Sequence, residues 1–117
     1  MPLRPKPAVQ PPIPADCPLE DVLTLLSGAW TAQILWFLRA GPRRFGDLRR
    51  DLARVSTKVL TNRLRIMESH GLLLREVLPG KPPQVEYSLT ALSRELEPIL
   101  DCMEQIARRL KQQETEG

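Results

Sequence analysis

Four polar residues between positions 58 and 65 have side chains suited to contacting nucleic acid. Lys58, Asn62 and Arg65 recur every three to four residues, and Thr61 lies beside them. On a helix of 3.6 residues per turn they share one face, which carries donors and no carboxylate. Asparagine can pair with adenine and arginine with guanine, so this face suits a groove of phosphates and base edges. An ordinary solvated helix surface is the alternative, which the surrounding sequence has to decide.

The flanking residues predict the helix that positions this face. The stretch 56–71 opens with two hydroxyl residues, which favour helix starts, and closes with Gly71, a typical helix stop. An apolar stripe at helical spacing lies opposite the polar face and consists of Leu60, Leu64 and Met67. The helix should dock this stripe on a core. Candidate DNA contacts on the stretch are Ser56, Thr57, Lys58, Thr61, Asn62 and Arg65.

Positive charge is concentrated around this stretch. The whole chain of 117 residues has a formal net charge of only +3. Residues 39–75, however, carry ten basic and three acidic side chains, whereas the segments on either side are net acidic. Such segregation is typical of an electrostatic footprint for nucleic acid, although arginines can also simply make a surface soluble.

Three shorter helices are predicted ahead of the stretch, over 18–27, 30–38 and 45–52. The second is apolar nearly all round and should be the buried spine of the domain. Arg43 and Arg44 precede the third helix and are predicted to face outward as phosphate contacts. Two helices joined by the short connection 53–55, the second with a donor-rich face, form a helix-turn-helix pattern.

A β-hairpin is predicted directly after the donor-bearing helix. Residues 72–78 and 84–89 read as two strands around the loop 79–83, with Val85, Tyr87 and Leu89 alternating. A hairpin in this place is a wing, and Lys81 near its tip is a further phosphate candidate. The predicted fold class is therefore α+β and mostly α, a winged helix-turn-helix with a two-stranded wing.

A long helix over 91–111 should follow, capped by Thr90 and bent at Pro98. Its apolar stripe exceeds what a domain of this size can cover, so we predict self-association through the terminal helices. Packing of that stripe within its own domain is the alternative.

The chain as a whole reads as one domain, 16–111, between two tails. Residues 1–15 hold six of the twelve prolines and predict a disordered tail, and 112–117 form a short C-terminal tail. Neither a secretory signal nor an apolar run of about 18 residues is present, which favours a cytoplasmic protein without membrane contact. One histidine and two distant cysteines make neither a metal site nor a nucleophile with its base, so we predict no enzyme activity and no cofactor.

Several short motifs occur along the chain in a telling order. They are Cys17-Pro18, Gly28 and Trp30, GPRRF at 41–45, Leu60-Thr61, Gly71-Leu72, and VEYSLT at 85–90. Together they resemble the HxlR-type winged helix-turn-helix transcriptional regulators, relatives of the MarR group. The resemblance implies a homodimer on a pseudo-palindromic double-stranded DNA operator, with each recognition helix in a major groove. Two departures are Ala29, where the family usually has a basic residue, and Ser93, where glycine is common.

Cys17 is a candidate sensor at the entrance of the first helix, where the positive end of the helix dipole favours a thiolate. Regulators similar to this one use a cysteine at this position to sense electrophiles or oxidants. The hypothesis is that modification of Cys17 weakens operator binding. The alternative is an inert residue near the dimer interface.

The sequence thus favours a sequence-specific DNA-binding regulator, most simply a repressor. A winged-helix module that binds a protein partner and not DNA is the alternative, and the charge of 39–75 argues against it. A thiol-redox enzyme is a weaker third reading, since no CxxC pair is present.

Overall fold

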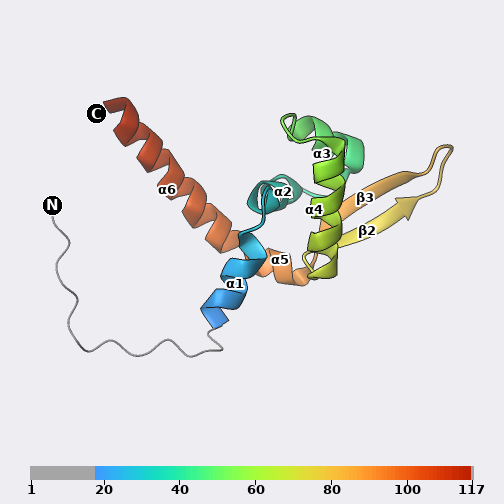
Figure 1. Ribbon diagram of the computed structural model, residues 1–117, viewed down its shortest axis with the longest axis horizontal. Helices are drawn as coiled ribbons and strands as arrows, with labels where there is room; N and C mark the ends of the chain where they lie inside the picture. Colours follow the sequence, from blue (N-terminus) through green and yellow to red (C-terminus); the bar gives the residue numbers. More distant parts are fainter. Residues whose placement is uncertain (1–17, 117) are drawn as a thin grey trace.

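The computed structural model describes residues 18–116 and has an α+β fold that is mostly helical (Figure 1). The elements are α1 (Pro18–Leu26), α2 (Thr31–Leu38), β1 (Arg43–Arg44), α3 (Phe45–Asp51), α4 (Thr57–Ser69), β2 (Leu73–Leu78), β3 (Gln84–Leu89), α5 (Ala91–Glu95) and α6 (Glu97–Glu116). This order confirms the predicted winged helix-turn-helix. The predicted tail 1–15 and Cys17 lie outside the described residues.

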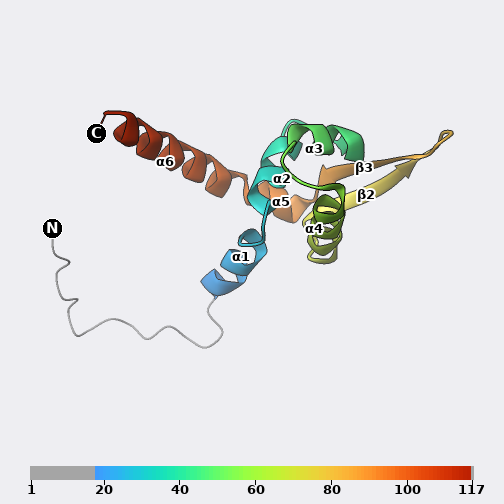
Figure 2. The same ribbon diagram turned by 45° about the horizontal axis from the view of Figure 1, so that its top comes forward.

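The wing is the long hairpin of a three-stranded antiparallel sheet. β2 pairs with β3 from Leu73↔Leu89 to Leu78↔Gln84, and the hairpin projects from the helices (Figures 1 and 2). A third strand, β1, pairs with β3 on its other edge, which the prediction of two strands lacked. Two residues are too few to show an alternating pattern, so this strand left no signal in the sequence.

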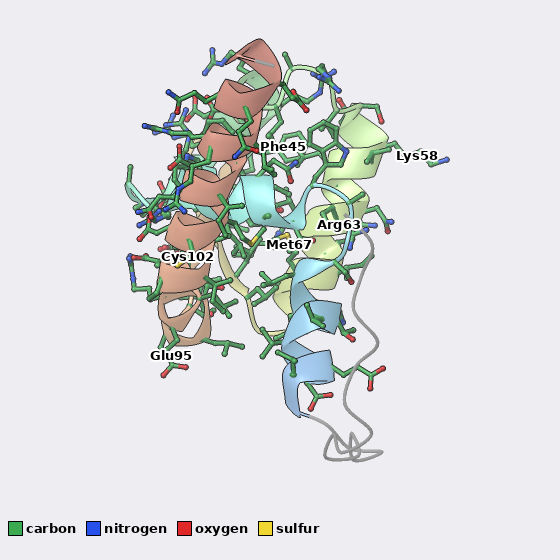
Figure 3. All side chains as sticks on the ribbon, turned by 90° about the vertical axis from the view of Figure 1, so that its left-hand side faces the viewer. Phe45, Lys58, Arg63, Met67, Glu95 and Cys102 are labelled. Atoms are coloured by element: carbon green, nitrogen blue, oxygen red, sulfur yellow. The ribbon has the colours of Figure 1, made fainter. Side chains whose placement is uncertain are left out.

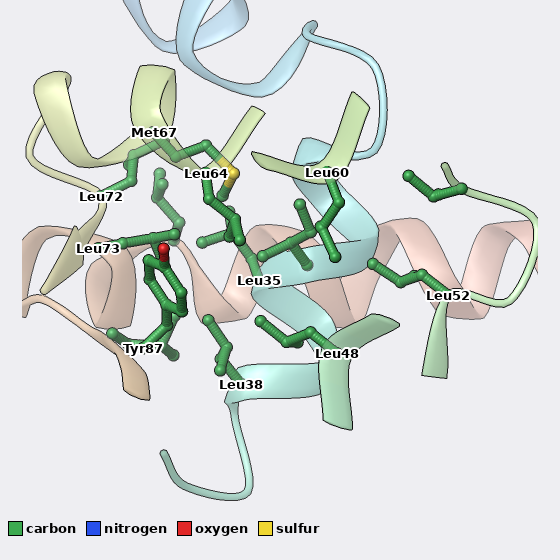
Figure 4. Packing of buried hydrophobic residues seen from close by; sticks show 14 of the residues in the cluster. Leu35, Leu38, Leu48, Leu52, Leu60, Leu64, Met67, Leu72, Leu73 and Tyr87 are labelled. Atoms are coloured by element: carbon green, nitrogen blue, oxygen red, sulfur yellow. The ribbon is translucent and has the colours of Figure 1, made fainter. Parts of the chain in front are cut away.

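The core lies between α2, α4 and the base of the wing (Figure 4). Ile34, Leu35 and Leu38 of α2 have no exposed surface. The other face of α2 is open, because Trp36 and Phe37 are 38% and 37% exposed. The predicted spine of the domain is therefore buried on one side only, and its other side lines a hollow with Leu100 and Met103 of α6.

Local signals explain the bounds of α4. The Ser56 hydroxyl accepts the backbone N–H of Val59 at 3.1 Å and caps the helix, as its position predicts. At the other end Gly71 has a φ of 76°, a left-handed conformation that favours glycine. Between these ends the apolar stripe is buried, with Leu60 and Leu64 fully enclosed. α4 is therefore held rigidly along its inner face.

The predicted terminal helix is two helices. α5 ends at Glu95 and α6 begins at Glu97, because Pro98 has no N–H to continue the first helix. Two hydrogen bonds link the start of α5 to the exit of α4. The buried Ser93 hydroxyl donates to the Leu72 carbonyl at 2.5 Å, and the Thr90 hydroxyl donates to the Gly71 carbonyl at 2.7 Å. α6 then runs to Glu116, beyond the helix end predicted at position 111.

α6 runs away from the body formed by α2, α4 and the sheet in both views (Figures 1 and 2). Much of its apolar surface is consequently open. Within residues 18–116, no single helix has both the length and the apolar composition of a membrane span; α1 and α2 reach them only as a pair bent by 82°.

Candidate nucleic-acid interface

The predicted hydrogen-bond donors lie on the solvent-facing side of α4. Thr57, Lys58, Asn62 and Arg65 are exposed and Thr61 is half-buried. A shallow groove of about 570 Å³ runs over this face, lined by Lys58, Val59, Thr61, Asn62 and Arg65. Lys58 extends away from the body of the molecule (Figure 3). The structure therefore brings these five predicted residues together, whereas the hydroxyl of Ser56, a sixth candidate, serves the helix cap.

A second hollow, of about 560 Å³, separates α4 from the wing. α4 contributes Thr57, Thr61, Arg65 and Glu68, and the wing contributes Arg75, Pro83, Gln84, Val85 and Tyr87. The expectation of a carboxylate-free face holds at Lys58, Asn62 and Arg65 but fails here, because Glu68 lies at the edge of that face. Anything that enters the hollow meets two arginines and one carboxylate.

Three of the cations in 39–75 are engaged in ion pairs. Arg39 binds Asp101 of α6 through two nitrogens, at 2.6 and 3.1 Å. Arg50 pairs with Asp47 one turn earlier on α3. Arg43 Nε lies 2.6 Å from Asp51 Oδ2, with both side chains partly buried. The expectation that Arg43 is free outside is therefore corrected, since its guanidinium holds α3 against β1.

The other cations of this segment have no carboxylate partner among the residues that the structure describes. They are Arg44, Arg49, Arg54, Lys58, Arg63, Arg65 and Arg75. Arg49, Arg54, Arg63 and Arg75 are not among the DNA contacts predicted from the sequence. For Arg75 a signal existed, because strand alternation places it on the same face as Tyr87.

The two remaining predicted phosphate contacts, Arg44 and Lys81, lie at different places on the sheet. Arg44 pairs in register with Glu86, which faces Glu76 on β2. Cross-strand partners share a face, so Arg44 lies beside two glutamates on the side of the sheet opposite Tyr87 and the hollow. Lys81 is exposed in the loop between β2 and β3, at the far end of the wing.

Arg63 occupies the flank of α4 that faces the connection between α1 and α2 (Figure 3). A Cβ added to Gly28 would lie 2.3 Å from Arg63 Nη1 and 2.9 Å from Thr31 Oγ1. A larger residue at position 28 would therefore have to displace the Arg63 guanidinium. The next turn is tight as well, since Trp30 has a φ of 68°, a left-handed conformation rare for a bulky residue.

Two ion pairs shift the pKa of their members. The hydrogen bond from Arg50 holds the pKa of Asp47 below its ordinary value. The hydrogen bond to Asp101 raises the pKa of Arg39. Within the described residues, no group of three His, Cys, Asp or Glu side chains could hold a metal ion.

Known proteins share this architecture. Residues 25–115 match the sequence model of the HxlR-like helix-turn-helix family. The HTH-type transcriptional regulator sll1512 of Synechocystis sp., itself uncharacterized, is 44% identical over 99 residues, which cover 85% of this chain and 73% of that protein. For further relatives the match spans about two thirds of their own length.

Solved structures of transcriptional regulators share this fold. The redox regulator HypR in its reduced form has a TM-score of 0.78 and 33% identity, covering 86% of this chain and 99% of that one. A chain described as a MarR-family regulator from Porphyromonas gingivalis W83 has a TM-score of 0.79 and 29% identity, covering 85% and 97%.

The exposed recognition helix and the adjoining wing define a winged helix-turn-helix transcriptional regulator. Within that class, the chain belongs to the HxlR-like helix-turn-helix family. It is a family of transcriptional regulators and not of enzymes, as the sequence predicts.

Proposed function

We propose that the chain is a cytoplasmic, sequence-specific DNA-binding repressor that acts as a homodimer on a pseudo-palindromic operator. One observation carries the proposal: α4 is buried along its apolar stripe and exposes Lys58, Asn62 and Arg65, none of which has a carboxylate partner within residues 18–116. A rigid helix with free donors is what major-groove readout requires.

The exposed residues divide into two roles. Asn62 and Arg65 are the base-reading residues, because an amide can pair with adenine N6 and N7 and a guanidinium with guanine O6 and N7. Thr57, Thr61 and Lys58 lie around them on the same face. Lys81 contacts phosphate from the wing, and Arg75 in the hollow between α4 and the wing is a further phosphate contact. Arg43, paired with Asp51, positions α3, and Arg44 remains a candidate only for DNA that reaches the outer side of the sheet.

The dimer rests on the open surfaces of the terminal helices. Leu19 and Leu23 of α1 are 66% and 57% exposed, and Ile106 and Leu110 of α6 are 52% and 57% exposed. A second copy that covers these side chains removes an apolar patch that water disfavours. Twofold symmetry then presents two recognition helices to two half-sites.

Selection of bound fragments from genomic DNA by the purified protein tests the function. An enriched inverted repeat is expected. Affinity for that repeat should fall steeply as salt rises, because each displaced phosphate counterion contributes to the slope. Enrichment of no sequence, or a salt-insensitive affinity, would favour the protein-binding alternative.

We also propose that Cys17 makes operator binding sensitive to oxidants or electrophiles. HypR, similar in sequence and structure, is described as a redox regulator. Operator affinity is measured before and after diamide or quinone for the wild type, Cys17→Ser and Cys102→Ser. The second cysteine, exposed on α6, is the matched control. Loss of the response only in Cys17→Ser is expected, and equal responses in wild type and Cys17→Ser would refute the role.

A further inference from the structure

Two consecutive arginines at the end of α3 make different contacts. Arg50 turns back to Asp47 on its own helix. Arg49 reaches across the helix-turn-helix, and its Nε–H donates to the Thr57 hydroxyl oxygen at 3.1 Å. Arg49 has no carboxylate partner among the described residues. This hydrogen bond is therefore a side-chain link between α3 and the first residue of the recognition helix.

Thr57 is free to serve as a contact because its neighbour caps the helix. The Ser56 hydroxyl accepts a hydrogen bond from the backbone N–H of Val59, so the Thr57 hydroxyl is not needed to cap the helix. Thr57 is exposed and lines the hollow between α4 and the wing. It therefore lies at the N-terminal end of α4, the end through which a recognition helix usually meets base edges.

The direction of the Arg49 hydrogen bond restricts what Thr57 can do. A threonine hydroxyl can donate one hydrogen bond and accept two, whereas a guanidinium can only donate. Arg49 Nε–H donates to the Thr57 hydroxyl oxygen, and Arg49 has no acceptor for the hydroxyl proton of Thr57. No acceptor for that proton is found among the described residues, so it is free to point to an acceptor outside the protein.

We propose that Arg49 is a positioning residue that fixes Thr57 as a hydrogen-bond donor to the operator. A donor at this place selects a base with a major-groove acceptor, such as guanine O6 or N7, adenine N7 or thymine O4. Cytosine is a weaker partner, because its N4 amine is itself a donor and can use only the one Thr57 lone pair that Arg49 leaves open. The inference rests on the proposed DNA-binding function and names one element of its sequence specificity.

The experiment selects bound duplexes from a randomised library with the full-length protein and its variants. Thr57→Val removes the hydroxyl, and the operator position whose base preference it weakens is the one that Thr57 reads. Arg49→Met, which keeps an unbranched stem without the guanidinium, should weaken preference at the same position. Loss of one hydrogen bond corresponds to about a threefold to tenfold drop in discrimination. The double variant should lose no more than Thr57→Val alone, and Arg50→Met, the matched neighbour, should keep the wild-type preference.

A measurement on the free protein separates this inference from the proposed function. The Arg49 Nε–H resonance in ¹H–¹⁵N spectra should shift in Thr57→Val and stay in place in Arg50→Met. An unshifted resonance overturns the inference. So does an Arg49→Met variant that loses affinity equally for every duplex with its base preference intact, since Arg49 would then be only a phosphate contact. A wild type that selects no sequence refutes DNA-sequence readout itself, even where the Arg49–Thr57 resonance shift is seen.

Discussion

The helices α4 and α6 are both amphipathic, yet the fold treats their apolar faces in opposite ways. On α4 the residues Leu60, Leu64 and Met67 are at most 1% exposed. On α6 Leu100 is buried, but the stripe beyond it is open, with Met103 at 46% and Ile106 at 52% exposure. A helix whose apolar face is satisfied inside its own chain can offer its polar face to a ligand. A helix whose apolar face is not satisfied needs a partner for that face.

The two helices are nevertheless connected. Arg39 ties α2 to α6 through Asp101, while Thr90 and Ser93 tie the exit of α4 to the start of α5. These contacts link the start of α5 and the first turns of α6 to the body that carries α4.

The largest expected effect is on stability, from Leu64→Ala on α4. The side chain is fully buried, so the loss of contacts and the cavity left behind should cost about 2–5 kcal/mol of unfolding free energy. Urea unfolding measures it. Val59→Ala, on the same helix but 45% exposed, should cost far less. Equal losses would mean that the two faces of α4 are not distinguished as described.

A charge on α6 should break association and leave the fold intact. Ile106→Asp places a carboxylate in the proposed dimer seam, and dimer dissociation should rise by about 100-fold or more, since an unpaired charge is costly to bury. Analytical ultracentrifugation reports the change, with the neighbouring Gln105→Asp as the control. An unaltered dimer would place the interface elsewhere.

Substitutions in α4 and in the loop of the wing should separate sequence specificity from general affinity for DNA. Arg65→Ala should cost about 1–3 kcal/mol on the selected operator and relax one base position. Lys81→Ala should weaken operator and random DNA alike and reduce the salt slope by about one. Fluorescence anisotropy on both duplexes distinguishes them. Equal losses on both DNAs for Arg65→Ala would contradict its role as a base reader.

The smallest effect concerns the acid stability of α3. Because Arg50 lowers the pKa of Asp47 in the folded state, the pair contributes stability above the ordinary aspartate pKa of 3.8. That contribution is lost as pH falls below 3.8 and through the lowered folded pKa. Asp47→Asn should therefore be slightly less stable than wild type at pH 7 and match it near pH 2, as judged by urea unfolding. A difference that persists at pH 2 would rule out the ion pair as its cause.

The sequence predicted α4 well because three independent signals agreed there: the cap at Ser56, the stop at Gly71 and the apolar stripe between them. The partners of individual arginines were not predictable in the same way. Arg43 was expected to face outward, but it pairs with Asp51, which only the packing of α3 against β1 brings within reach. The break at Leu96 was visible as Pro98, yet a bend and a break leave the same trace in a sequence. The Arg49–Thr57 contact depends on the angle between two helices, which no local pattern encodes.

The most direct test of the account is a ¹H–¹⁵N titration of the protein with the duplex that it selects. We expect the shifted amides to lie in Thr57–Arg65 of α4 and in the loop between β2 and β3, with the amides of α6 unaffected. Shifts confined to the open faces of α2 and α6, with α4 unchanged, would contradict it.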